Sequence, residues 1–203
     1  MDEQHCREKL ITAALDLFSR QGYDATTTAQ IAAAAGISPS DFTRHFATKD
    51  AVIMSLVADL MHGIVAALAH VNIDTDPIEA LLIANTETLT AVIEGHGVTT
   101  RERMLTMSYI VASDPKLQQQ ASAIRKQILT HGLAERMQVD PQDQLVRRAV
   151  TMWSAIAAGL YSGRRSLPPN YDPRRDGWLS ERMIVRLSQT FDDVMGRAPH
   201  HKI

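Results

Sequence analysis

The sequence predicts an all-α protein of about nine helices, with a three-helix module at its N-terminus and a larger helical domain behind it. Three observations predict this class. Apolar residues recur along the chain at the three- and four-residue spacing of a helix. Helix-capping residues and glycine stops separate these stretches. Only 5% of the 203 residues are aromatic, and the sequence has no convincing alternation typical of strands.

The first two helices are predicted from their faces and ends. Leu10 begins an apolar stripe at helical spacing, and Gly22 follows it as a natural stop. A second helix is expected to start after Thr27, because Gln30 lies three residues further on and completes a capping box. Gly36 then closes this short, alanine-rich helix.

A third helix follows almost at once, which indicates a tight helix-turn-helix. Gly36 supplies the left-handed turn, and Ile37 is expected to pack back onto the preceding helix. Ser38 and Pro39 are the expected N-cap and first helical residue, and the Asp41 carboxylate is expected to accept from the backbone N–H of Ser38. From capping and spacing alone, an ordinary helical corner with a solvated face remains as good an interpretation as DNA binding.

The rest of the chain shows longer helical stretches. A fourth helix is expected from Thr48, its cap, to about residue 70. A loop rich in Pro, Gly and Arg, residues 162–177, carries the pairs Arg164-Arg165 and Arg174-Arg175; we expect a solvated loop, with capture of an anionic group as the alternative. The remaining helical stretches are expected within 76–96, 101–114, 115–137, 143–163 and 178–195.

Composition excludes several classes. The net charge is −2, and residues 1–50 hold five Lys and Arg against seven Asp and Glu, so nucleic-acid binding must depend on where the charges lie. The single cysteine, Cys6, excludes a disulfide within one chain, and the His residues lack metal-ligand spacing, so we expect no metal site and no cofactor. The sequence has no secretory signal and no uninterrupted apolar run of the ~18 residues that a membrane span needs, so we expect a cytoplasmic protein without a membrane partner.

Residues 22–53, "GYDATTTAQIAAAAGISPSDFTRHFATKDAVI", resemble the DNA-binding module of the TetR family of transcriptional repressors. The resemblance covers roughly residues 8–53 and implies a domain at 1–50 that binds DNA. It also implies a domain at 51–203 that senses a ligand and dimerises, so that a homodimer binds a palindromic double-stranded operator. Thr43 stands where the family commonly has Tyr. The motif positions that match are Gly22-Tyr23, Thr26-Thr27, Ile31-Ala32, Ala35-Gly36-Ile37-Ser38, Phe46 and Thr48-Lys49-Asp50.

Within this module, Arg44 is the strongest predicted base contact, because its guanidinium matches guanine O6 and N7. Ser40 and Thr43 are short enough to bond a base edge or touch a thymine methyl. Thr27 and the Thr48-Lys49 pair are predicted at phosphates, where helix N-termini favour anions. His45 is interpreted either as a phosphate contact or as a half-buried structural residue. The predicted DNA-binding residues are Thr27, Thr28, Ser38, Ser40, Thr43, Arg44, His45 and Lys49.

A small-molecule site is predicted in the second domain. Asn85 interrupts an otherwise apolar stripe, and a buried amide must find a polar partner in the protein or in a ligand. Methionines and a tryptophan around it can line an adaptable cavity, although such residues are more often plain core. The predicted ligand-binding residues are Met61, Asn85, Leu89, Met104, Met107, Gln127 and Trp153, with His131 as a further candidate.

The last two helices are predicted to form the dimer interface, since both carry wide apolar stripes and the resemblance implies a four-helix contact between subunits. The alternative is that both stripes pack within one chain. The predicted interface residues are Val146, Val150, Trp153, Ala157, Ile184, Leu187, Phe191 and Val194.

Two other functional classes are weighed against a ligand-responsive regulator. The sequence has no Gly-rich phosphate loop, no HExxH and no Gly-x-Ser-x-Gly, so we do not expect an enzyme. A helical adaptor that binds other proteins without sequence-specific DNA binding is the alternative function. In that case Arg44 and Lys49 are dispensable, whereas a repressor needs them for DNA binding.

Overall fold

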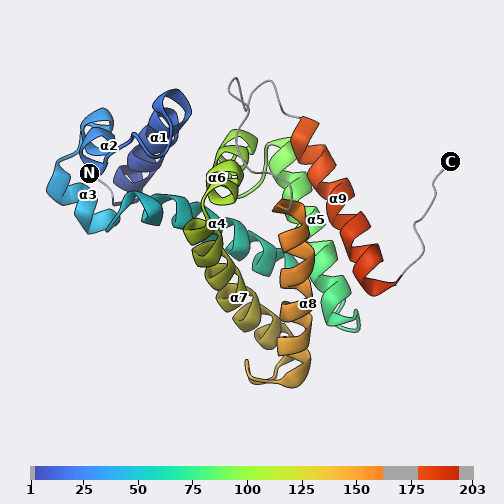
Figure 1. Cartoon of the computed structure of the whole chain (residues 1–203). Coiled ribbons are helices and arrows are strands. Elements are labelled where there is room, and N and C mark those ends of the chain that lie inside the picture. The colour runs from blue at the N-terminus through green and yellow to red at the C-terminus, as the bar shows by residue number, and fades with distance from the viewer. Residues whose placement is uncertain (1–2, 162–177, 197–203) are drawn as a thin grey trace.

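The computed structural model describes residues 3–161 and 178–196, and the side chains in these ranges except those of 158–161 and 178–183. In this part of the chain it contains nine helices and no strand, which confirms the all-α prediction (Figure 1). The two arginine pairs at 164–165 and 174–175 lie outside the described residues. The helices are α1 (Glu3–Gln21), α2 (Thr28–Ala35), α3 (Pro39–His45), α4 (Lys49–Leu68), α5 (Pro77–Glu94), α6 (Arg101–Ser113), α7 (Pro115–Met137), α8 (Gln144–Tyr161) and α9 (Trp178–Met195).

The helices form two groups that α4 joins. Helices α1, α2 and α3 lie together at one end, and we call them the head (Figure 1). Helix α4 runs from the head into the remaining helices, α5 to α9, which we call the body. There it packs chiefly against α7 and α5, while α8 packs against α7, α9 and α5. The predicted boundary at residue 50 falls in the first turn of α4, and the division into two domains stays a prediction.

The short helices of the head begin and end at the predicted residues. Thr27 is the N-cap of α2, and its side chain and Gln30 form the complete capping box. Gly36 ends α2 with φ 65°, a left-handed conformation that side chains other than glycine rarely adopt. Ser38 caps α3, with Pro39 as its first residue. The tight turn between α2 and α3 thus follows from local sequence.

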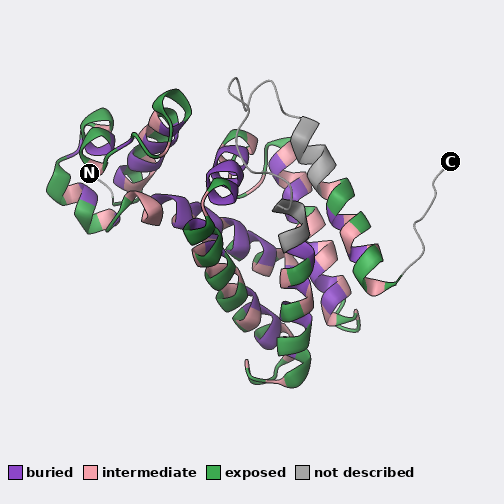
Figure 2. Cartoon of the chain, viewed as in Figure 1, coloured by how far each residue is buried: buried purple, intermediate pink, exposed green. Residues whose placement is uncertain are grey.

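A continuous apolar core extends from the head into the body through α4, as Figure 2 shows by burial. Cys6 of α1 is part of this core rather than of a mobile terminus. The stretch Pro39–Leu68, which contains α4, is long and apolar enough by composition to cross a membrane, unlike our expectation from the sequence. Half of its most apolar window is buried in the fold, and this burial accounts for its composition.

Helix α4 approaches α7 closely because glycine lies at the crossing. Gly132 of α7 faces Val65 of α4, and a Cβ at position 132 would overlap the valine side chain. Gly63 of α4 lies against Val98 in the same way. These contacts fix α4 against its neighbours and so set the direction in which it reaches the head.

Candidate functional site

The outward face of α3 is small and polar, while its inward face holds two phenylalanines. Phe42 and Phe46 are buried, with ring centroids 6.1 Å apart. Ser40, Thr43 and Arg44 are exposed. Since residues three and four apart share a face of a helix, these three side chains form one surface. The structure therefore brings together the three residues predicted to contact bases.

Arg44 is paired with the acid on its own helix. Its Nη2 lies 2.9 Å from Asp41 Oδ1, and its side chain is 67% exposed. The other oxygen of Asp41 accepts from Ser38 Oγ at 2.7 Å, where we expected a bond to the Ser38 backbone. The carboxylate thus holds both the cap and the guanidinium. An exposed ion pair contributes only ~0–1 kcal/mol, so Arg44 can exchange Asp41 for a base at little cost.

Two predicted DNA contacts are engaged as helix caps. Thr27 Oγ1 accepts from the Gln30 backbone N–H and donates to the Gln30 side chain, both at 3.2 Å. Ser38 Oγ accepts from the Asp41 N–H and donates to the Asp41 carboxylate. Each hydroxyl accepts the capping N–H through a lone pair and gives its one proton to a side chain of the same helix, so donation to a phosphate would replace that side-chain bond and leave the cap in place. Both residues are helix caps in this structure, and their DNA contacts stay predictions.

The remaining predicted residues of the head differ in their surroundings. Thr43 Oγ1 donates to the Pro39 carbonyl at 3.0 Å, so the hydroxyl offers DNA a lone pair rather than its proton. His45 is half-buried, as the structural interpretation expected, and its buried Nε2 has no hydrogen-bond partner. Thr28, in the first turn of α2, is half-buried.

Lys49 is turned toward the protein. Its Nζ donates to the backbone carbonyls of Tyr23 at 2.6 Å, Thr26 at 3.1 Å and Asp24 at 3.3 Å, and lies 4.3 Å from the centre of the Tyr23 ring. All three carbonyls belong to the turn between α1 and α2. The three bonds use the three protons of the ammonium. This geometry gives the Lys49 side chain a structural role in the protein without DNA, and its phosphate contact stays a prediction.

The next residue connects the same turn to the body. Asp50 accepts from the Tyr23 hydroxyl at 2.6 Å and pairs with Lys116 of α7 at 2.9 Å. Burial raises the pKa of Tyr23, and the bond to Asp50 raises it further. Burial also favours the protonated form of Asp50, but the bonds from Tyr23 and Lys116 outweigh this and hold its pKa below the ordinary value. The bond to Asp50 raises the pKa of Lys116.

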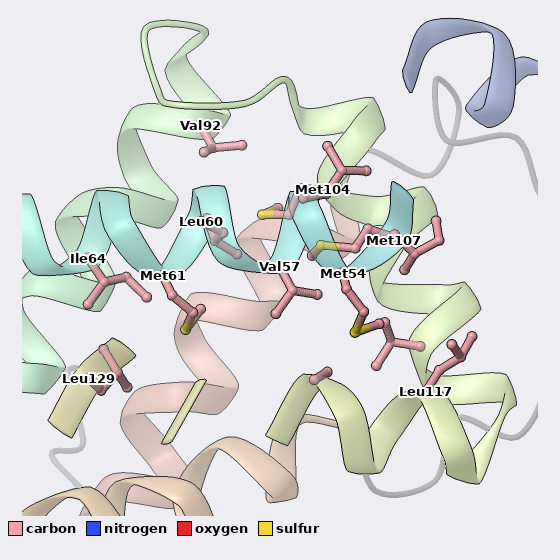
Figure 3. Packing of buried hydrophobic residues seen from close by; sticks show 14 of the residues in the cluster. Met54, Val57, Leu60, Met61, Ile64, Val92, Met104, Met107, Leu117 and Leu129 are labelled. Atoms are coloured by element: carbon pink, nitrogen blue, oxygen red, sulfur yellow. The ribbon is translucent and has the colours of Figure 1, made fainter. Parts of the chain in front are cut away.

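The body contains a small cavity beside α4. It leaves about 30 Å³ for the centres of water-sized molecules, enough for one or two waters. Figure 3 shows Leu60, Met61 and Ile64 along α4, with Met104 nearby on α6. Met107 is buried and Gln127 is exposed, and neither is among the described residues that line the cavity. The described lining residues are Leu60, Met61, Ile64, Asn85, Leu89, Met104, Ser108, Arg125, Trp153 and Ala157.

Three polar side chains interrupt this mostly apolar wall. Asn85 comes from α5, Ser108 from α6 and Arg125 from α7. Ser108 is 1% exposed, and its Oγ has no hydrogen-bond partner. A buried hydroxyl without a partner costs ~1–3 kcal/mol. In the described part of the chain, no group of three or more His, Cys, Asp and Glu side chains is placed to hold a metal ion.

The family model of the bacterial regulatory proteins of the TetR family matches residues 10–56. This range contains most of α1, the helix-turn-helix of α2 and α3, and the start of α4. Residues 10–56 are thus a DNA-binding module of the TetR type, and the helix-turn-helix of α2 and α3 lies within it.

Individual relatives extend the comparison. The HTH-type transcriptional regulator TcmR of Streptomyces glaucescens is 39% identical over 75 residues, which are 37% of this chain and about a third (33%) of TcmR. A candidate TetR-family regulator of Syntrophomonas wolfei has a TM-score of 0.60 at 16% identity, covering 98% of this chain and all (100%) of that one. SmeT, the repressor of the Stenotrophomonas maltophilia multidrug efflux pump SmeDEF, has a TM-score of 0.52 at 22% identity, covering 91% of each chain. It has also been solved with triclosan. The solved structures show a shared fold.

Two ion pairs tie the head to helices that line the cavity. Arg7 of α1 lies 2.9 Å from Asp59 of α4, directly before the lining residue Leu60. Arg103 of α6, directly before Met104 of the cavity wall, lies 2.8 Å from Glu8 of α1 and bonds Thr12 as well. These two ion pairs connect α1 to two of the helices that line the cavity.

Most of the predicted dimer-interface residues are buried within a single chain, and the interface itself stays a prediction. Trp153 and Phe191 are 1% and 0% exposed in one chain. The apolar stripes of α8 and α9 face each other and the body. Ile184 is half-buried, and Val194 alone of the predicted set is exposed. The predicted residues buried within the chain are Val146, Val150, Trp153, Ala157, Leu187 and Phe191.

Several contacts of this site escaped sequence reasoning. Ser108 and Arg125 have no signal of their own, because a serine or arginine at helical spacing is ordinary until a neighbouring helix is placed against it. The Tyr23–Asp50–Lys116 link joins residues far apart in sequence. For Lys49, the signal was the aromatic residue at position 23, which offers both a ring and a nearby turn.

Proposed function

We propose that this protein is a transcriptional repressor that binds a palindromic operator as a homodimer and releases it when a small, largely apolar effector enters the body. One observation carries the proposal. Two of the helices that line the cavity, α4 and α6, also hold α1 of the DNA-binding head, through Asp59 and Arg103. The same two ion pairs therefore connect the cavity wall to the DNA-binding head.

For DNA binding, α3 enters the major groove with its exposed face toward the bases. Arg44 exchanges Asp41 for guanine O6 and N7, with an expected discrimination of ~1–3 kcal/mol. Ser40 and Thr43 contact neighbouring base edges, and Thr28 at the start of α2 contacts phosphate through its backbone N–H and hydroxyl. His45, the last residue of α3, is half-buried and remains a candidate phosphate contact.

The charge of the head sets the strength of the phosphate contacts. Five basic residues stand against seven acidic ones in residues 1–50, and Lys49 is engaged within the protein. Few phosphates are therefore neutralised, and the salt dependence of operator binding is shallow. A slope of log K against log salt concentration steeper than about −8 for the dimer contradicts this part of the proposal.

The effector acts by widening the cavity. Its volume of about 30 Å³ is far below the ~300–1,000 Å³ of ordinary small-molecule sites, so an effector must displace wall residues. Met61 on α4 and Met104 on α6 are the flexible residues at which such a displacement begins. It shifts α4 and α6, the two ion pairs follow, and the separation of the two heads in the dimer changes. The complex of SmeT with triclosan supports the ability of this fold to admit small molecules.

Dimerisation uses the outer surface of α8 and α9. Leu145 is 58% exposed and Val185 is 55% exposed, and Val194 adds an exposed apolar side chain to the same pair of helices. Burial of these residues between two copies offers a reason for their exposure in one chain. Sedimentation of a Leu145→Glu, Val185→Glu variant tests the surface, with Ile73→Glu as the matched control because Ile73 is at least as exposed (63%) but lies between α4 and α5.

The deciding experiment is selection of bound sequences from a random double-stranded DNA pool by the purified full chain. We expect enrichment of a palindrome with half-sites about 34 Å apart, one turn of DNA. The Arg44→Ala variant should lose the preference at one position of each half-site. Absence of any enriched sequence contradicts the proposal and favours an adaptor that acts without sequence-specific DNA binding. In the proposed role the protein acts in the cytoplasm without a membrane partner.

A further inference from the structure

We propose that the effector is a small, mainly apolar molecule that carries one anionic oxygen group, a carboxylate or an ionised phenol, held by Arg125 with Ser108 and Asn85 beside it. This inference rests on the proposed function, because it names the chemical class of the ligand for the same cavity. It adds the residues that select the ligand, which sequence patterns do not reveal.

Ser108 supplies the first observation. Its neighbours on buried helix faces use their hydroxyls within the protein: Thr88 Oγ1 donates to the Ala84 carbonyl at 2.8 Å. The Ser108 hydroxyl is equally buried, lines the cavity and has no partner. Buried polar groups in folded proteins are almost always bonded, so an orphan that lines a cavity indicates a partner that comes with the occupant.

Arg125 supplies the sign of the charge. It is the one ionisable residue in the described lining of the cavity, and its guanidinium can only donate hydrogen bonds. The paired N–H groups of a guanidinium match the two oxygens of a carboxylate. No described lining residue carries a negative charge that would attract a cation. The polar part of the occupant is therefore a hydrogen-bond acceptor, and an anionic acceptor binds the guanidinium most strongly.

The rest of the cavity wall determines the chemistry of the remaining part of the ligand. Met61, Leu89, Met104 and Trp153 offer only apolar or weakly polar surface. The two methionines can change rotamer to enlarge the space at modest cost, whereas Trp153, at 1% exposure, is fixed by its packing. The occupant is therefore a compact or flexible apolar group with its single anionic end toward α7.

Trp153 allows the binding to be measured directly. With the second tryptophan, Trp178, replaced by Phe, fluorescence reports the cavity wall alone. We would titrate the full chain with octanoate, octan-1-ol and octylammonium at pH 7.5, since these probes share one apolar body and differ in the head group. Octanoate should bind at least about tenfold more tightly than octylammonium, as expected for charge-assisted hydrogen bonds, and more tightly than octanol.

Variants assign the preference to its residues. Arg125→Gln should reduce the affinity for octanoate to that for octanol, whereas Lys126→Gln, which removes the same charge from an exposed neighbour on α7, should leave it unchanged. Ser108→Ala should weaken octanoate binding about 2–10-fold and serves as the second test if Arg125→Gln fails to fold. Equal affinities for the three probes, no saturable change with any of them, or equal effects of Arg125→Gln and Lys126→Gln would overturn the inference.

Failure of this inference can be told apart from failure of the proposed function. The unliganded protein is used for the DNA selection, so a recovered palindrome supports the regulator whatever the probes do. An enriched operator without a preference for octanoate overturns only the ligand class. A clear preference for octanoate with no enriched DNA supports the ligand class and overturns the regulator.

Discussion

Lys49 offers the sharpest test of how the head is built, because its predicted and observed roles have different consequences. The change is Lys49→Met, which keeps most of the aliphatic stem and removes the ammonium. In the structure this ammonium donates to two part-buried carbonyls at 2.6 and 3.1 Å and to an exposed one at 3.3 Å, and it lies over the Tyr23 ring. We therefore expect the substitution to destabilise the fold.

The magnitude follows from these contacts. Hydrogen bonds to charged groups contribute ~1.5–3 kcal/mol each when desolvated, and partial exposure lowers this, so the two part-buried bonds together give about 2 kcal/mol. The contact with the ring adds ~0.5–1 kcal/mol. Removal of a positive charge from the first turn of α4 stabilises the helix by ~0.3–1 kcal/mol, because that charge is unfavourable at a helix N-terminus. The expected loss is about 2 kcal/mol, or a fall of about 4–8 °C in Tm for a chain of this length.

Two assays separate the roles. Thermal unfolding of the full chain measures stability, and operator binding between about 50 and 200 mM salt measures the number of phosphate contacts. We expect a lower Tm and an unchanged salt slope, and the exposed Lys126→Met should change neither. If Lys49 instead contacts phosphate, Tm stays constant and the slope becomes shallower by about 0.9 for each subunit. That result would refute the structural role.

Three further predictions concern the base contact, the core and the acid link. Arg44→Ala should weaken binding to the selected operator by ~1–3 kcal/mol per half-site and relax the preference at one base, as measured by competition gel shift; uniform weakening on all sequences would argue for a phosphate contact instead. Phe191→Ala should lower the free energy of unfolding by ~3–5 kcal/mol in urea, since the ring is fully buried within one chain; a change in dimer dissociation alone would contradict the burial. Asp50→Asn should lower the Tm at pH 7. The pKa of Asp50 is lowered in the folded state, so its contribution to the free energy of unfolding is complete above about pH 4. That contribution is lost as the pH falls through the folded-state pKa. The Tm values of wild type and variant should therefore converge below about pH 4. A difference in Tm between wild type and variant that stays constant from pH 7 to pH 3 would show that the carboxylate does not stabilise the fold.

The local signals of the sequence predicted the head closely. The caps at Thr27 and Ser38 and the turn at Gly36 depend on backbone conformation and on neighbours within a few residues, so the sequence contains all that determines them. The inward direction of Phe42 and Phe46 follows from helical spacing alone. The direction of Lys49 does not, because a lysine in the first turn of a helix can face solvent or fold back onto a distant turn.

The body was predicted less well because periodicity identifies an apolar face without naming what covers it. The stripes of α8 and α9 look the same whether they meet a second subunit or the rest of the chain, and the structure assigns Trp153 and Phe191 to the latter. Asn85 was found because it breaks a pattern. Ser108 and Arg125 break none, and only the packing of α6 and α7 around α4 brings them to the cavity.

The small size of the cavity also bears on the speed of a response. Any molecule larger than one or two waters must wait until the wall opens, so the wall sets an upper limit on the rate of entry. The observed association rate should then level off at high ligand concentration instead of rising in proportion to it. For the proposed function, the response would then be timed by the motion of the wall residues Met61 and Met104 rather than by the concentration of the ligand.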